Sequence, residues 1–197
     1  MAGVIKSGGT TRRAVKMVCL NADHPEIEDF IWLKAREEKK AYALMDAGYS
    51  GGMEGDAYTT VTGQNANFSV RLTDDFLQKV EADRPWDLLS RVDGKVTKTL
   101  PARGLFRQIA EAAWESADPG VHYDSTQQLW HTCKNSGRIN TTNPCSEYLF
   151  LDSTACNLAS LKLTAFLRVD GSFNVPEFQD AVRTFIIAQD ILVDLSS

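Results

Sequence analysis

The chain contains few of the residues that mark several protein classes. Its 197 residues include only three histidines and four cysteines. No apolar run approaches the roughly 18 to 20 residues of a membrane span, and the N-terminus lacks the apolar core of a signal peptide. We therefore expect no membrane partner and a cytoplasmic location. In a reducing compartment the four cysteines are expected to react as thiols, not to form a disulfide framework.

Positively charged residues are also fewer than negatively charged ones. The chain has 21 Lys and Arg against 26 Asp and Glu, a formal net charge of -5. A non-specific nucleic-acid binder needs a surplus of cations to displace counterions from phosphates, so no nucleic-acid partner is expected. Hydrophobic residues make up 43% of the chain, which is enough to bury a core at this length.

Alternating strand and helix patterns predict an α/β fold with a partly parallel sheet. Strand patterns occupy residues 15–20 and 68–72, and helical patterns occupy 24–47, 73–83, 102–117 and a segment opened by Pro176. Asp23 and Thr73 are expected to cap the first two helices. The Asp-Gly pairs at 93–94 and 170–171 each predict a hairpin.

The Gly-, Thr- and Asn-rich stretch over 49–67 is expected to be loop, with at most one short strand. A long loop and a final helix without a cap are unusual for a complete domain. We therefore expect this chain to be a piece of a larger domain.

The stretch NTTNPCSEYLFLD, residues 140–152, carries the most specific chemistry. In an extended segment Asn143, Cys145 and Glu147 would face one cavity together, and Pro144 and Ser146 would face away. Pro144 disfavours both a helix and a central strand, which favours a loop tip entering a cavity. A carboxylate, an amide and a thiol together suit chemistry on a diol.

Three other interpretations of these cysteines remain open at the level of the residues. A cysteine protease is disfavoured because His131 is the only nearby histidine and no motif links it to Cys145. A zinc site from His131, Cys133, Cys145 and Cys156 lacks paired CxxC spacing, so we predict no metal site. Burial as small hydrophobic residues is the commonest fate of free cysteines.

Resemblance to a known family decides among these interpretations. The segments NPCSEYLFLD and TACNLASL resemble the active-site segment of ribonucleotide reductases, particularly the class II, adenosylcobalamin-dependent enzymes. IKSGGTTRRAVKMVCLNADHPEIEDFI, GQNANFSVRL, AAWESADPGVHYD and SGRINTTNPCSEY also resemble consecutive segments of that family. The resemblance implies that residues 1–197 belong to a ten-stranded α/β barrel domain, incomplete at both ends, with the catalytic cysteine on a loop that enters the barrel.

The resemblance also implies roles for four residues. Cys145 would carry a thiyl radical that removes the 3′ hydrogen of a ribonucleotide. Glu147 would act as the base for the 3′ hydroxyl, and Asn143 would hold the ribose hydroxyls. Cys156 would belong to the reducing disulfide pair, whose other member lies upstream of residue 1 in the family. The resemblance gives no role to the other two cysteines, Cys19 in a strand and Cys133 in a loop.

The glycine-rich start KSGGTTRR, residues 6–13, has a composition suited to phosphate or to the polar edge of a base. It matches neither GxxxxGK[ST] nor GxGxxG, and by composition alone a flexible surface turn is favoured. The stretch resembles the specificity loop of the family, which lies between an effector deoxynucleotide and the substrate base and couples the two. The candidate residues are Ser7, Gly8, Gly9, Thr10, Thr11, Arg12 and Arg13.

The implied function is radical-based reduction of ribonucleotides to 2′-deoxyribonucleotides for DNA synthesis. The implied cofactor is adenosylcobalamin, and the implied partners are a deoxynucleotide or ATP effector, a thioredoxin- or glutaredoxin-type reductant and a second copy in a homodimer. The alternatives are a class I large subunit, whose radical comes from a separate metal protein, and a non-catalytic nucleotide-binding remnant. The 197 residues alone are expected to be inactive, and the sequence does not distinguish diphosphate from triphosphate substrates.

Overall fold

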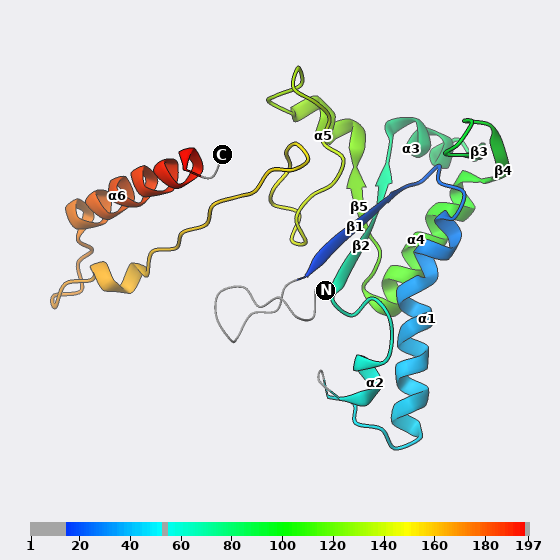
Figure 1. Cartoon of the computed structure of the whole chain (residues 1–197), viewed down its shortest axis with the longest axis horizontal. Helices are drawn as coiled ribbons and strands as arrows, with labels where there is room; N and C mark the ends of the chain where they lie inside the picture. The colour runs from blue at the N-terminus through cyan, green and yellow to red at the C-terminus, as the bar shows by residue number, and fades with distance from the viewer. Residues whose placement is uncertain (1–14, 53–54, 196–197) are drawn as a thin grey trace. The chain divides into compact units, whose positions relative to one another are not determined.

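Three parallel strands form a sheet in the first part of the chain (Figure 1). In this computed structural model, which describes residues 15–52 and 55–195, the strands are β1 (Lys16–Asn21), β2 (Ala66–Leu72) and β5 (Gly120–Tyr123), in the order β1-β2-β5. Cys19 pairs with Ser69, and Arg71 pairs with His122. Parallel neighbours need crossover connections, and helices between the strands supply them.

One face of this sheet is apolar and is covered by helices. α1 (Ile27–Asp46) and α4 (Ala102–Ser116) lie against it (Figure 1). Ile31, Val70 and Leu105 are fully buried in one apolar cluster. Because side chains alternate along a strand, the residues between these core positions point to the opposite face. That opposite face is polar and carries Cys19, Asn67, Ser69, Arg71 and His122.

Most of the predicted elements are confirmed with small shifts of their ends. β1 begins and ends one residue later than predicted, and β2 begins two residues earlier. Thr73 caps α3 (Asp74–Glu81), since its side-chain oxygen accepts from the backbone N of Phe76 at 3.2 Å. α4 ends at Ser116, one residue before the predicted end.

The predicted start of the first helix is wrong by three residues. α1 begins at Ile27, and Asp23 does not cap it. The Asp23 carboxylate instead pairs with Arg91, and its backbone oxygen accepts from the Leu89 N at 2.7 Å. The carboxylate therefore binds the connection between the two strands at 85–89 and 96–101, and this contact between distant residues replaces the local cap.

Residues 49–67 were expected to be loop with at most one short strand; the described part is mostly loop but also contains a short helix, α2 (Asp56–Thr59), and the start of β2. The first hairpin is confirmed: β3 (Pro85–Leu89) pairs antiparallel with β4 (Val96–Pro101), and Gly94 adopts φ +70°. Its connection over 90–95 is wider than the tight turn predicted. β5 and α5 (Asp124–Trp130) were not predicted, because segments this short show no clear periodicity.

The chain divides into two compact units, residues 1–152 and 153–197. The second unit contains the 3₁₀ helix η1 (Leu163–Phe166), a hairpin closed by the Leu167–Phe173 bridge with Gly171 at φ +82°, and α6 (Val175–Asp194). The rings of Phe166 and Phe178 pack edge-on, 5.3 Å apart. The hairpin and the final helix are both as predicted.

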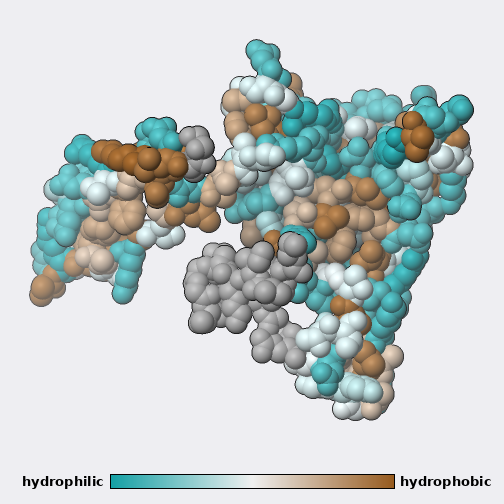
Figure 2. Space-filling view, in the orientation of Figure 1, coloured by the Kyte–Doolittle hydropathy of each residue, from teal (hydrophilic) through white to brown (hydrophobic). Residues whose placement is uncertain are grey.

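Apolar residues in the second half of α6 are exposed, and Figure 2 shows brown surface on this helix. These residues are Phe185, Ile186, Ile187, Ile191, Leu192 and Val193. None of the helices in the described ranges has both the length and the apolar character needed to cross a membrane. The α/β class is confirmed, but the strands described here form an open three-stranded sheet and a hairpin, not a closed barrel.

Candidate active site

Cys145 lies in a tight turn. The backbone N of Ser146 donates to the Asn143 oxygen at 3.0 Å, and Ser146 adopts φ +62°. The expected loop tip is therefore present, but the expected extended conformation is wrong. The chain reverses at Pro144 and Cys145, so the rule of alternate sides does not apply to Asn143, Cys145 and Glu147.

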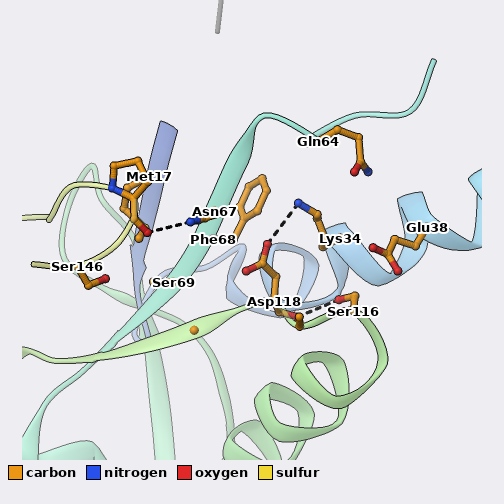
Figure 3. Close-up of a pocket in the computed structure, with 13 residues that line it drawn as sticks. Met17, Lys34, Glu38, Gln64, Asn67, Phe68, Ser69, Ser116, Asp118 and Ser146 are labelled. Carbon is orange, nitrogen blue, oxygen red and sulfur yellow. Dashed lines mark hydrogen bonds and ion pairs between the residues drawn. The ribbon is translucent and has the colours of Figure 1, made fainter. Parts of the chain in front are cut away.

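The polar face of the sheet holds the residues on either side of Cys145. The Asn67 side chain, which is labelled in Figure 3, donates from Nδ2 to the Pro144 oxygen at 2.8 Å. The His122 Nε2 lies 3.2 Å from the Ser146 hydroxyl. Two neighbouring strands, β2 and β5, thus each contribute one contact to the turn.

Hydrogen bonds inside the loop add to this hold. Thr142 is 7% exposed, and its hydroxyl donates to the Asn143 backbone oxygen at 2.9 Å. The Asn143 Oδ1 accepts from the Tyr148 backbone N at 2.9 Å. The Asn143 Nδ2 has no partner among the described residues, so this amide still has a donor to offer to a ligand.

The thiol of Cys145 and the carboxylate of Glu147 are exposed. Within the part of the chain that the structure describes, neither group has a hydrogen bond or ion pair. Both are therefore available for chemistry on a bound molecule. Cys156 is also exposed, but it lies in the second unit, and residues 7–13 lie outside the described ranges.

A cavity of about 560 Å³ adjoins the turn (Figure 3). Met17, Asn67 and Gly120 line it from the three strands, and Pro144 and Ser146 line it from the loop. Asn143, Cys145 and Glu147 are not among its lining residues, so this cavity is not the one that those three side chains were expected to share. At the far side Lys34 pairs with Asp118 at 3.4 Å, with both side chains mostly buried, so these two charges neutralise each other.

A buried ionic cluster anchors the start of the loop. The Arg71 Nη2 donates to the Asp124 carboxylate and, at 3.0 Å, to the Ile139 oxygen, and Arg138 binds the other Asp124 oxygen. The Gln128 Nε2 donates to the same Ile139 oxygen at 2.7 Å. Burial raises the pKa of Asp124, but the hydrogen bond and charge of Arg71 outweigh it, so the pKa lies below its ordinary value.

His122 is 4% exposed and connects two strands to the loop. Its Nδ1 lies 3.5 Å from the Cys19 sulfur, which also lies 3.0 Å from the Thr141 hydroxyl. Burial, and then the nearby charge of Arg71, lowers the pKa of His122. The ring is therefore neutral near pH 7, with one nitrogen as donor and the other as acceptor.

Sequence reasoning missed this supporting set of Asn67, Arg71, His122 and Asp124. Its only sequence signal is the alternation of Asn67, Ser69 and Arg71 along one face of β2. Cys19 is in a strand and Cys133 in a loop, as predicted.

The protease and zinc interpretations find no support in the geometry. His131 is 6% exposed, and neither ring nitrogen has a hydrogen-bond partner in the described ranges. Its ring packs edge-on against Phe150, with centroids 6.0 Å apart. Across residues 15–52 and 55–195, no group of three or more His, Cys, Asp or Glu could hold a metal ion.

A family model described as "Ribonucleotide reductase, barrel domain" matches residues 1–197. The chain belongs to this ribonucleotide reductase family. This is the family that the resemblance implied.

Several relatives carry names that specify a cofactor. A vitamin B12-dependent ribonucleotide reductase of Streptomyces avermitilis is 54% identical over 196 residues, and one of Rhodopirellula baltica is 52% identical over 199 residues. These alignments cover 98% and 100% of this chain. A vitamin B12-dependent ribonucleoside-diphosphate reductase of Thermoplasma acidophilum is 35% identical over 168 residues, 85% of this chain. The chain spans about a fifth of the length of these reductases (20%, 19% and 19%).

Proposed function

We propose that this chain is a catalytic-barrel segment of an adenosylcobalamin-dependent ribonucleotide reductase, which makes 2′-deoxyribonucleotides for DNA synthesis. The observation that carries the proposal is the Cys145 turn. It presents an exposed thiol two residues along the chain from the Asn143 amide and from the Glu147 carboxylate, and it is held against the polar face of a parallel sheet. Family membership and the names of the relatives support the same function.

In this proposal Cys145 gives up a hydrogen atom and then, as a thiyl radical, removes the 3′ hydrogen of the ribose. Glu147 takes the 3′ hydroxyl proton, while the free Nδ2 of Asn143 donates to a ribose hydroxyl. The 2′ oxygen leaves as water. Cys145 finally returns a hydrogen atom to the 3′ carbon.

The two electrons come from a pair of thiols. Cys156 and a partner cysteine outside this chain supply them and end as a disulfide, so that a ribonucleotide and two thiols give a deoxyribonucleotide, water and a disulfide. A thioredoxin- or glutaredoxin-type dithiol then reduces this disulfide. A cytoplasmic location is part of the proposal, because a reducing compartment keeps these thiols available.

When bound, adenosylcobalamin supplies the initiating radical through homolysis of its cobalt–carbon bond. The described residues fit the receiving end of this chemistry, since the Cys145 sulfur is exposed and has no competing hydrogen bond. Cobalamin brings its cobalt already bound by the corrin ring, so no cluster of protein ligands is needed to mark its site. We therefore assign to this segment the thiol alone and name no residue that holds the corrin.

The remaining partners belong to the same proposal. Residues 7–13 would couple a deoxynucleotide or ATP effector to the substrate base, and the full-length protein would be a homodimer. The isolated chain is expected to be inactive, because β1 and β5 are open edges of its sheet and Cys145 is exposed to solvent. Deoxynucleotide formed by the chain alone, with cobalamin and a dithiol, would contradict this expectation.

The test uses a full-length reductase that contains this segment. Residues 1–197 would replace the matching 196 residues of the Streptomyces avermitilis relative, and both diphosphate and triphosphate substrates would be assayed with adenosylcobalamin and a dithiol. We expect deoxynucleotide formation without a second subunit, which a class I large subunit would require. We expect Cys145→Ser to abolish it and the control Cys133→Ser to leave it unchanged. An inactive chimera, or an active Cys145→Ser variant, would reject the proposed function.

A further inference from the structure

The position of the Cys145 sulfur depends on its neighbours. Its side chain is exposed and makes no hydrogen bond within the described residues. The turn itself is short, and Ser146 lies in the left-handed region at φ +62°, which is unfavourable for a residue with a side chain. Besides the hydrogen bonds within the loop, contacts from the sheet help to keep this conformation in place.

Asn67 supplies the first such contact, before Cys145. It lies at the second position of β2, paired with Met17 of β1, so its backbone is fixed by the sheet. Its Nδ2 donates to the Pro144 oxygen at 2.8 Å. Because the acceptor is a backbone carbonyl, only a donor side chain can make this contact.

His122 supplies the second contact, after Cys145. It lies on β5, the strand next to β2, and its Nε2 is 3.2 Å from the Ser146 hydroxyl. On its other side the Cys19 sulfur lies 3.5 Å from Nδ1, which restrains the ring. The ring is 4% exposed, so water competes little for these contacts.

We propose that Asn67 and His122 are positioning residues that clamp the turn at Pro144 and Ser146 and so fix the sulfur between them. The inference rests on the proposed function, in which Cys145 exchanges a hydrogen atom with a ribose. Such a transfer needs the reacting atoms in contact, and a displacement of about 1 Å can lower a rate by about 100-fold. The clamp fixes the position of the Cys145 thiol while leaving the thiol exposed. A hydrogen bond made by the thiol itself would also fix it, but the sulfur would then be less available to react.

The first experiment measures steady-state kinetics of the chimeric reductase. Asn67→Asp keeps the shape but replaces the donor with an acceptor, and Ser146→Ala removes the hydroxyl that meets His122. We expect each to lower kcat by about 10- to 100-fold and to change KM by less than about threefold. The matched controls are Asn65→Asp and Tyr123→Phe, whose side chains make no hydrogen bond among the described residues, and we expect both to retain full kcat.

Two further variants separate positioning from folding. His122→Gln keeps a donor and is expected to recover much of the kcat lost in His122→Ala. The double variant with Ser146→Ala is expected to lose less than the sum of the two single losses, because both changes remove the His122–Ser146 contact, and Ser146→Ala also removes the 3.3 Å hydrogen bond from the Thr142 hydroxyl. Additive losses of kcat in the double variant, or a kcat of His122→Gln no higher than that of His122→Ala, would show that His122 acts through something other than its contact with Ser146.

The second experiment needs no activity. In the 197-residue chain the amides of Ser146 and Tyr148 are bonded within the loop. We expect Asn67→Asp to speed their hydrogen exchange by about tenfold and Asn65→Asp to leave it unchanged. The clamp would be overturned if Asn67→Asp and Ser146→Ala changed neither the hydrogen exchange nor kcat. If Cys145→Ser were inactive in the same assays, the proposed function would still stand. An active Cys145→Ser variant would overturn the proposed function.

Discussion

The two exposed thiols with proposed roles are held in different ways. Cys145 has bonded neighbours on both sides, anchored to two strands of a sheet. Cys156 lies in a segment without helix or strand. The residue that follows it is anchored to α6: Asn157 donates from Nδ2 to the Gln189 backbone oxygen at 3.0 Å, and its backbone oxygen accepts from the Gln189 side chain at 3.2 Å. The difference fits the proposed roles, because a thiol that meets the ribose must be fixed, whereas a thiol that exchanges disulfides must be able to move.

The largest effect is expected from removing the second thiol. In the chimeric reductase, Cys156→Ser should leave radical formation intact but block repeated turnover with a dithiol reductant. Electron paramagnetic resonance would follow the radical, and product per enzyme would report turnover. Normal multiple turnovers in this variant would show that Cys156 is not part of the mechanism. The difference in how the two thiols are held would then have no functional meaning.

The next effect concerns the anchor of the Cys145 loop. Asp124 is 5% exposed and binds both Arg71 and Arg138, so Asp124→Asn should lower the free energy of unfolding by about 3 kcal/mol. Urea unfolding of the 197-residue chain would measure it. Asp46→Asn, at an exposed position without a partner among the described residues, serves as the control. A loss for Asp124→Asn no larger than that of the control would show that the cluster does not hold the loop.

The pKa of Asp124 gives this anchor a pH dependence. The folded protein holds the pKa below its ordinary value, so the stabilisation is fully present above about pH 4 and is lost as the pH falls through the folded pKa. Between pH 7 and pH 3 the unfolding free energy of the wild type should therefore fall more steeply than that of Asp124→Asn. Parallel pH profiles would contradict the lowered pKa.

The smallest effect is expected at the anchor of Cys156. Gln189→Ala removes one of the two reciprocal bonds to Asn157 and should cost about 1 kcal/mol or less in unfolding free energy. Hydrogen exchange over residues 155–159 should rise, while the turn at 143–148 stays protected. Gln179→Ala, exposed on the same helix, is the control. Equal exchange in both variants would show that the α6 contact does not order the Cys156 segment.

Local chemistry made much of the fold predictable. Thr73 caps α3 through a residue three positions away, Gly94 permits the hairpin turn, and the apolar spacing of α4 defines its buried face. The short elements β5 and α5 escaped prediction because four and seven residues are too few for a periodic signal. Asp23 was misassigned because its partner, Arg91, lies 68 residues away.

The sequence by itself determined which residues are proposed to carry the chemistry: Asn143, Cys145 and Glu147 from residue types, spacing and family resemblance, and Cys156 from the resemblance alone. Tertiary structure alone decided how the first thiol is held. The contact between Asn67 and Pro144 spans 77 residues, and that between Cys19 and Thr141 spans 122. Contacts over such separations depend on which strands become neighbours, and a one-residue shift in strand pairing would move every one of these side chains to the other face.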